Sequence, residues 1–262
     1  MPELTAESAV DVMRRALDKF IALLRSADAS RSVPGMTWTV GEVAVHVLSG
    51  CRGYLVMATG GDPVWKSFAT SAEDNDAMIA ATSEHDLASV ADALPPAVND
   101  LAEFCLARGD AMVPWHENTE VPASVVAGLI AGELLLHGRD IAKAINAPWE
   151  VTRTDAAIVM EAGLYITPHF VIESAARGFS ATYDLRLHGG GHYTLSFADG
   201  ALTTNAGAPE HPDCRIAADP RAFMLVAYGR ESLWRAIGTG KMLAWGRRPW
   251  LGFQLLPKLR NP

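Results

Sequence analysis

Hydrophobic residues recur every three or four positions through most of the first half of the chain, a spacing that predicts amphipathic helices. Helices are expected over residues 6–27, 39–57, 86–107 (bent at Pro95–Pro96) and 123–145. The second begins with a capping box, in which the Thr39 side chain caps the helix and Glu42 reaches back. The polar residues 67–76 are expected to form a loop. Four helices with alternately long and short connections predict a bundle.

The second half of the chain changes to alternating polar and apolar positions, after a fifth helix expected over residues 155–176 with a kink at Pro168. ATYDLRLHG and GHYTLSFADG alternate strictly and predict a hairpin, and ALTTNAG and DCRIAADP predict two more strands. PRAFMLVAYGR, ESLWRAIGTG and PWLGFQLLPKL are predicted to form short helices. The chain is therefore expected to comprise a helical bundle over residues 1–150 and a smaller α+β domain, with a mostly antiparallel sheet, over residues 151–262.

Glu133 and His137 lie four residues apart in AGELLLHGRD and so share one face of the predicted helix. The rest of that face is apolar: Val126, Ile130, Ile141 and Ala144. Among 30 acidic residues and 8 histidines, about one such spacing arises by chance, and a surface pair needs no function. A polar pair on a core-facing stripe is costly without partners, however, which makes both residues candidate metal ligands.

A third candidate ligand, His46, lies in the middle of the predicted helix GEVAVHVLSGCRGYL. Small residues share its face and would leave room beside the imidazole: Ser49, Gly50 and Gly53. Two histidines and one carboxylate suit zinc with an open fourth position, and they also suit other divalent ions. Asp140 is a candidate partner for the second ring nitrogen of a ligating histidine, the alternative being a solvated residue near the helix end.

Composition narrows the function classes. The formal net charge of −8 and a pI near 5.5 argue against a nucleic-acid partner, and the absence of a Lys/Arg run argues against a polybasic membrane patch. The longest apolar stretches are too short to span a bilayer, and the first residues predict an amphipathic helix rather than a signal peptide. Three widely spaced cysteines fit reduced thiols, so a cytoplasmic location is expected.

MTWTVGEVAVHVLSG together with AGELLLHGRDIAKAI resembles the N-terminal domain of the mycothiol-dependent maleylpyruvate isomerase family, a branch of the DinB-like four-helix bundles. The resemblance implies a His–Glu–His metal site at His46, Glu133 and His137. The remainder, from ATYDLRLHGGGHYTLSFADG to TGKMLAWGRRPWLGFQLLPKL, resembles a sterol-carrier-like domain, so the similarity covers nearly the whole chain. One departure is Arg139, where family members commonly have Trp, and it leaves the family's named substrate open here.

The resemblance implies mycothiol as a cofactor and a small electrophile, such as a maleylpyruvate-like diacid, as the substrate. An open position on zinc lowers the pKa of a bound thiol, which can then act in cis–trans isomerisation or in S-transfer. A dianionic substrate would favour a nearby cation, and Arg139 and Arg230 are candidates. His116, in the loop VPWHENTE before the metal helix, is a candidate pocket residue, whereas His188 and His192 are expected beside an exposed turn.

The competing hypothesis is a non-catalytic protein that binds a lipid or other small molecule in the sterol-carrier-like domain. Aromatic and aliphatic residues could line an apolar tunnel there, although such residues more often form plain core. The candidates are Phe223, Leu225, Trp234, Trp250 and Phe253. This hypothesis predicts a cavity in the second half and needs no metal triad.

Overall fold

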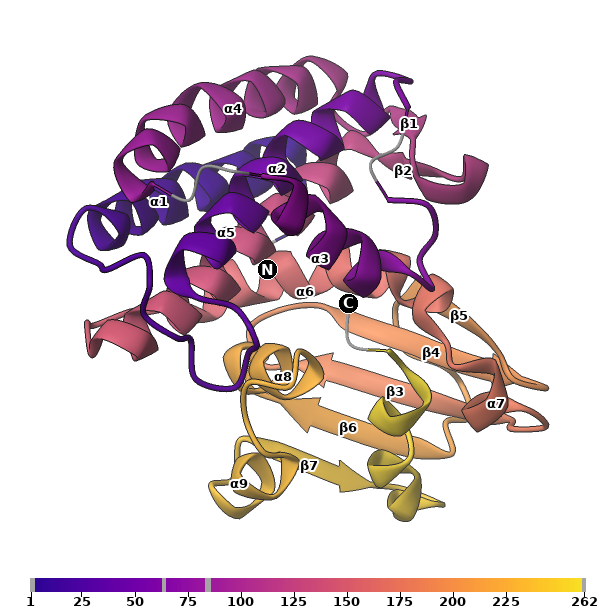
Figure 1. The fold of residues 1–262 in the computed structure, drawn as a ribbon. Coiled ribbons are helices and arrows are strands. Elements are labelled where there is room, and N and C mark those ends of the chain that lie inside the picture. The colour runs from indigo at the N-terminus through magenta and orange to yellow at the C-terminus, as the bar shows by residue number, and fades with distance from the viewer. Residues whose placement is uncertain (1–2, 63–64, 83–85, 261–262) are drawn as a thin grey trace. The chain divides into compact units, whose positions relative to one another are not determined.

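The chain divides into two compact units, residues 4–151 and residues 152–262. The structure, a computed structural model, describes residues 3–62, 65–82 and 86–260 (Figure 1). The first unit is helical and the second contains the sheet. The expected fold class, a helical bundle followed by an α+β region, is confirmed.

The first unit is a four-helix bundle formed by its four long helices. They are α1 (Ala6–Leu24), α2 (Val40–Ala58), α4 (Leu87–Arg108) and α5 (Ala123–Ile145). Both α1 and α2 pack against α4 and α5, so that the four elements surround one apolar core. The capping box expected at the start of α2 is present: the Thr39 Oγ1 accepts from the Glu42 amide, and the Glu42 carboxylate accepts from the Thr39 amide. This cap fixes where α2 begins and therefore where its later side chains point.

Two elements of the first unit differ from the expectations. Helix α3 (Ser71–Ala81) begins inside residues 67–76, which were expected to form a loop. The segment before α5 forms a hairpin of β1 (Met112–Pro114) and β2 (Glu120–Pro122) around the 3₁₀ turn His116–Asn118. In α3 only Ile79 is buried, so the helix has no apolar stripe that its sequence could reveal.

The second unit is built on one five-stranded sheet. Its strands are β3 (Ala181–Leu187), β4 (His192–Ala198), β5 (Ala201–Ala206), β6 (Cys214–Ala218) and β7 (Met242–Trp245). They lie in the order β5-β4-β3-β6-β7, and only the β3–β6 pair is parallel, so the mostly antiparallel sheet is confirmed. Strand β7 was not expected, and it forms one edge of the sheet.

Short helices complete the second unit. They are α6 (Arg153–Ile166), η2 (Thr167–Phe170), α7 (Glu173–Ala176), α8 (Pro220–Ala227), α9 (Leu233–Gly238), η3 (Pro249–Phe253) and η4 (Leu256–Lys258). The single helix expected over residues 155–176 is wrong: the α-helix ends at Ile166, because Pro168 lacks the amide hydrogen that would continue it. PWLGFQLLPKL likewise forms two 3₁₀ turns rather than a helix.

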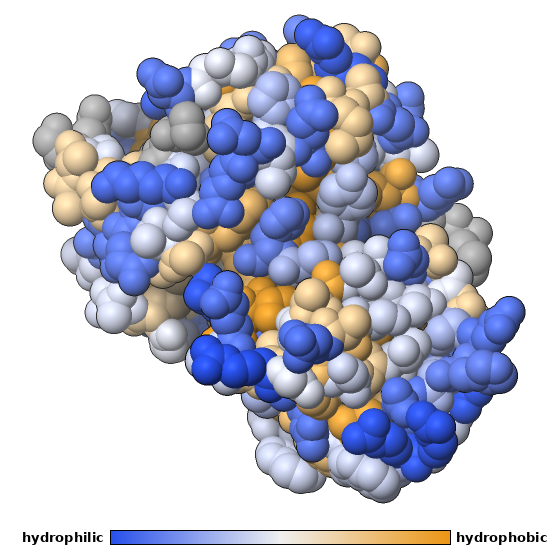
Figure 2. Space-filling model, turned by 90° about the vertical axis from the view of Figure 1, so that its right-hand side faces the viewer, coloured by the Kyte–Doolittle hydropathy of each residue, from blue (hydrophilic) through white to orange (hydrophobic). Residues whose placement is uncertain are grey.

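Among the described residues, no helix is long and apolar enough to cross a membrane. Figure 2 shows that strongly hydrophilic residues cover much of one face of the molecule, and that hydrophobic residues are exposed in smaller areas between them.

Gly138 allows a tight contact that can be tested. A Cβ atom at this position would lie 2.1 Å from the ring of Trp149, whose indole nitrogen donates a hydrogen bond to the carbonyl of Leu135. We expect Gly138→Ala to displace Trp149, at a cost of about 1–3 kcal/mol that exceeds the gain of up to about 1 kcal/mol in helix propensity. Thermal unfolding in the presence of a chelator should then show a lower melting temperature.

The matched control is Gly50→Ala, also inside a helix, where the nearest atom to the new methyl group would be Ile130 Cδ1 at 3.9 Å. Here the melting temperature should stay the same or rise. A Gly138→Ala protein as stable as the Gly50→Ala protein would show that the Trp149 contact contributes nothing.

Candidate metal centre

Three polar side chains from two helices of the bundle meet at one point. His46 comes from α2, and Glu133 and His137 come from adjacent turns of α5. The Glu133 Oε2 lies 3.1 Å from the Nε2 of His46 and 3.1 Å from the Nε2 of His137. The two imidazole rings are 4.9 Å apart and nearly perpendicular. The polar pair on the apolar stripe of α5 therefore finds its partner on the facing helix.

The environment keeps the carboxylate charged. Both histidines are buried, and 29% of the Glu133 side chain is exposed. Burial raises the pKa of Glu133, but the hydrogen bonds from His137 and His46 outweigh it and hold the pKa well below its usual range. The group is thus an anion at neutral pH between two nitrogen donors.

This donor set fits a divalent cation. One ligand atom from each of the three residues lies within 4.8 Å of the others. Two imidazole nitrogens and one carboxylate oxygen are a common set for zinc when a fourth position remains open. The same set also accepts other divalent ions, so the chemistry of the donors favours zinc without requiring it.

Asp140 lies behind the second nitrogen of one histidine. Its Oδ2 is 3.4 Å from His137 Nδ1, and the side chain is buried. The alternative of a solvated residue at the helix end is therefore wrong. A carboxylate in this place orients the imidazole and favours the tautomer that carries its proton on Nδ1, which leaves the lone pair of Nε2 available to a metal ion.

Trp38 packs against the cluster; it lies in the segment MTWTVGEVAVHVLSG that carries the family resemblance, but it was not among the candidate site residues. Its ring lies 5.0 Å from the His46 ring, and its indole nitrogen donates a hydrogen bond of 2.8 Å to the Asp76 carboxylate on α3. The sequence feature that could have identified Trp38 as a site residue is its position, one residue before the N-cap of α2. The indole shields one side of His46 from solvent.

The other candidate residues are not part of this group of three ligands. His116 is buried among the rings of Trp65, Phe68 and Trp115. Arg139 is half-buried and two residues beyond His137, so it points to a different side of α5. Arg230 belongs to the second unit, where it donates to the carbonyl of Tyr228.

Two further histidines lie on the sheet or at its turn. His188 is exposed after β3, as expected. His192 is half-buried in β4 and is in direct contact with the buried carboxylate of Asp184, so it is part of the sheet rather than of an exposed turn.

None of the three cysteines of the chain offers a thiolate. All three are free and buried. Burial raises the pKa of Cys51 to about 12, with a further contribution from the charge of Glu133, and burial raises the pKa of Cys105 to about 12. Burial also raises the pKa of Cys214. A thiol nucleophile at neutral pH would therefore have to come from outside the chain.

Comparisons with known proteins give matches in both units of the chain. Residues 10–142 match the model of the mycothiol maleylpyruvate isomerase N-terminal domain, and residues 171–246 match that of the SCP-2 sterol transfer family. A crystal structure of the mycothiol-dependent maleylpyruvate isomerase is similar over 91% of this chain and 92% of its own, with 15% identity and a TM-score of 0.53. A histidine-to-alanine mutant of that enzyme gives the same coverage, with 15% identity and a TM-score of 0.51.

No curated protein matches the sequence. At 15% identity the structural similarity establishes the fold alone, whereas the first family model covers half of the chain. The chain therefore belongs to the family defined by the mycothiol maleylpyruvate isomerase N-terminal domain.

Proposed function

We propose that the protein is a divalent-metal- and thiol-dependent isomerase that acts on a small electrophile such as a maleylpyruvate-like diacid. The observation that carries the proposal is the convergence of His46, Glu133 and His137 within the domain that assigns the family. These three residues would hold the ion, with zinc as the expected metal. When bound, the metal would act as a Lewis acid and lower the pKa of a coordinated thiol towards neutrality.

The chain's own residues prepare the site for this chemistry. Glu133 brings a negative charge that stabilises a cation, and Asp140 holds the His137 ring in one orientation. Trp38 keeps solvent from one side of His46. Because the thiols of the chain are buried and protonated, the nucleophile is expected to be a small molecule, and mycothiol is the candidate that the family suggests.

Isomerisation by this route uses the thiol catalytically. The thiolate adds to one carbon of an activated double bond, the remaining single bond rotates, and elimination of the same thiolate restores the double bond in the other geometry. Arg139 and Arg230 are our candidates for binding the carboxylates of a diacid substrate. S-transfer differs in that the thiol stays bound to the product and is consumed.

The test is turnover of maleylpyruvate by the zinc-loaded protein with and without mycothiol, followed by absorbance and by titration of free thiol. We expect conversion only when the thiol is present, with no net consumption of thiol. A thioether product formed together with thiol loss would identify a transferase instead. Absence of any thiol-dependent reaction would contradict the proposal.

Cys51→Ala is the control for this assay. Since burial and Glu133 keep the Cys51 thiol protonated, the variant should retain turnover within a few-fold of the wild type. Loss of turnover in the variant, at normal zinc content, would show that the chain supplies its own nucleophile.

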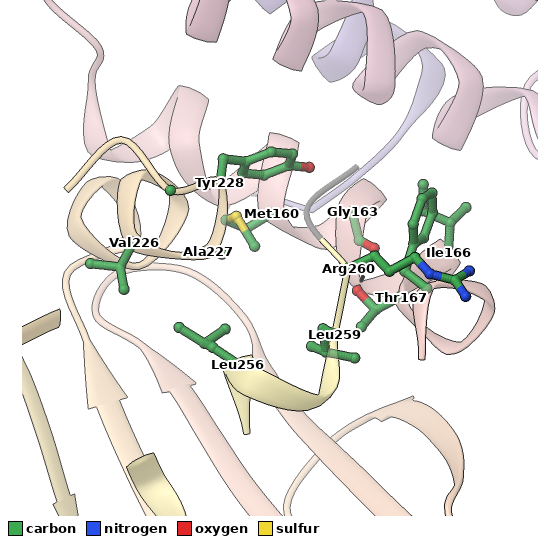
Figure 3. Close-up of a pocket in the computed structure, with 12 residues that line it drawn as sticks. Met160, Gly163, Ile166, Thr167, Val226, Ala227, Tyr228, Leu256, Leu259 and Arg260 are labelled. Atoms are coloured by element: carbon green, nitrogen blue, oxygen red, sulfur yellow. Dashed lines mark hydrogen bonds between the residues drawn. The ribbon is translucent and has the colours of Figure 1, made fainter. Parts of the chain in front are cut away.

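A pocket in the second unit supports a second candidate function, the binding of an apolar small molecule. The cavity has a volume of roughly 240 Å³ and lies between α6, the end of α8 and the C-terminal segment (Figure 3). Its lining is largely apolar and includes Met160, Val226, Leu256 and Leu259, with the cationic Arg260 among the lining residues.

The residues expected to line an apolar tunnel are not those that line this cavity. Phe223 is buried and Leu225 is half-buried, whereas Trp234, Trp250 and Phe253 are exposed. Binding in this pocket needs none of the three metal-site residues. A variant without the metal ligands therefore separates the two candidate functions. It should lose thiol-dependent isomerisation and keep the binding of an apolar small molecule.

A further inference from the structure

The second unit exposes an unusual group of large apolar side chains. Among the described residues, eight large hydrophobic side chains are exposed, and five of them lie between residues 234 and 253. They are Trp234 (70% exposed), Leu243 (53%), Trp245 (40%), Trp250 (54%) and Phe253 (42%). Single exposed apolar residues are ordinary, but large apolar side chains that are exposed side by side mark an interaction surface.

Trp234, Trp250 and Phe253 belong to α9 and η3, and η3 lies on the face of β7 that Ala244 occupies. Leu243 and Trp245 alternate with Ala244 and so lie on the opposite face of this edge strand. Helix α9 and the turn η3 both pack against β7, the edge strand, and α9 and β7 lie together at one end of the sheet in Figure 1. The Trp234 and Phe253 rings stack at 5.1 Å, and the Arg186 guanidinium lies 5.9 Å from the Trp245 ring. We call residues 233–253 the β7 edge surface.

The β7 edge surface is also basic. From Ser232 to the end of the chain there are six Lys and Arg residues and no Asp or Glu, in a protein whose formal net charge is −8. Arg235, Lys241 and Arg247 are exposed. The carboxylates that face Arg235 and Arg247 belong to Glu231 and Asp213, whose side chains are only 14% and 12% exposed. These ion pairs offset part of the positive charge, but the Arg235 and Arg247 side chains are 77% and 74% exposed and so remain accessible to a partner.

These cations are spread over the sequence, which is why no Lys/Arg run predicts a basic patch. The fold brings them beside the exposed aromatic rings. A two-fold contact between two copies of the chain would set this basic surface against itself, and like charges would oppose it. An occupant that combines negative charge at its surface with an apolar interior fits both the cations and the exposed rings.

We propose that the β7 edge surface binds the surface of bilayers that contain anionic phospholipids. Trp is favoured at the membrane–water interface because its ring is apolar and its indole nitrogen is polar. Basic side chains next to such rings are attracted to anionic headgroups. The exposed rings would enter the interfacial layer, while Arg235, Lys241 and Arg247 remain at headgroup level. This binding requires no membrane-spanning helix.

The test is flotation of the whole protein with vesicles of phosphatidylcholine alone or of equal parts phosphatidylcholine and phosphatidylglycerol. We expect binding to the mixed vesicles at low salt, release at high salt, and a blue shift of the tryptophan emission on binding. The double variants Trp234→Ser/Trp250→Ser and Arg235→Gln/Lys241→Gln should each weaken the partition constant by about tenfold or more.

The matched control is Arg14→Gln/Lys19→Gln, which removes two exposed cations from α1, far along the sequence from the β7 edge surface. It should bind as the wild type does, and all variants should keep the wild-type melting temperature. Equal binding to both vesicle types, or wild-type binding by the two β7 edge variants, would overturn the proposal. A wild-type dimer in light scattering that becomes a monomer in Trp234→Ser/Trp250→Ser would also overturn it, and would assign the surface to self-association.

Discussion

Zinc is expected to be absent from the His46→Ala/His137→Ala protein and present at about one ion per chain in the wild type. The double variant removes two of the three ligand atoms that converge within 4.8 Å, and one carboxylate alone holds a divalent ion only weakly. Elemental analysis of the two purified proteins, without affinity tags and after exposure to zinc, measures the difference directly. Thiol-dependent turnover should be lost together with the metal.

The control replaces two histidines that are exposed and outside the cluster, as His188→Ala/His211→Ala. This protein should keep its zinc. That result would show that zinc is lost from His46→Ala/His137→Ala because the cluster is removed, and not because the protein contains fewer histidines. Zinc that remains in the His46→Ala/His137→Ala protein would contradict the assignment of the ligands. If the wild type binds no zinc, the proposal of a metal-dependent isomerase is wrong. Binding of an apolar small molecule in the pocket of the second unit would then be the better supported function.

Asp140→Ala is expected to weaken zinc binding by about tenfold to a hundredfold. The carboxylate is buried and faces His137 Nδ1 at 3.4 Å, so its removal frees the ring to turn and removes the charge that makes the opposite nitrogen a better donor. Competition with a chromophoric chelator gives the affinities of the wild type and the variant.

Asp140→Asn keeps an oxygen that can accept a hydrogen bond but removes the charge. The zinc affinity of this variant should therefore lie between the affinities of the wild type and of Asp140→Ala. If both variants bind zinc as the wild type does, Asp140 has no part in positioning His137. If Asp140→Ala alone also loses its cooperative unfolding transition, the effect is structural, and Asp140→Asn then decides whether the charge matters.

The helices of the bundle were predictable because burial imposes a regular spacing on them. In α5 the predicted and observed ends are the same, and in α2 the capping box marks the first turn. Helix α3 was missed because it buries only Ile79 and therefore carries no periodic signal. Strand β7 was missed because it pairs with β6, from which it is separated by two helices in the sequence, and such a partner leaves no local pattern.

The candidate site was partly predictable for the same reason. Glu133 and His137 stood out because they interrupt an apolar face, and the facing position of His46 followed from bundle geometry and from the family resemblance. Trp38 and Asp76 were not among the candidate residues. Their hydrogen bond joins Trp38, which precedes α2, to α3, whose sequence has no apolar periodicity. Likewise, exposure of Trp234, Trp250 and Phe253 depends on where β7 lies, which the spacing of these residues does not reveal.

The separation of the site's two halves along the chain has a consequence for folding. His46 and Glu133 are 87 residues apart in sequence, and an ion between them would join α2 to α5. An unfolded chain seldom brings such distant residues together, because closing a long loop costs conformational entropy. A metal that binds the folded chain alone would therefore stabilise it in proportion to the logarithm of the free metal concentration. The supply of metal in the surroundings would then set how much of the protein is folded, as well as how much of it is active.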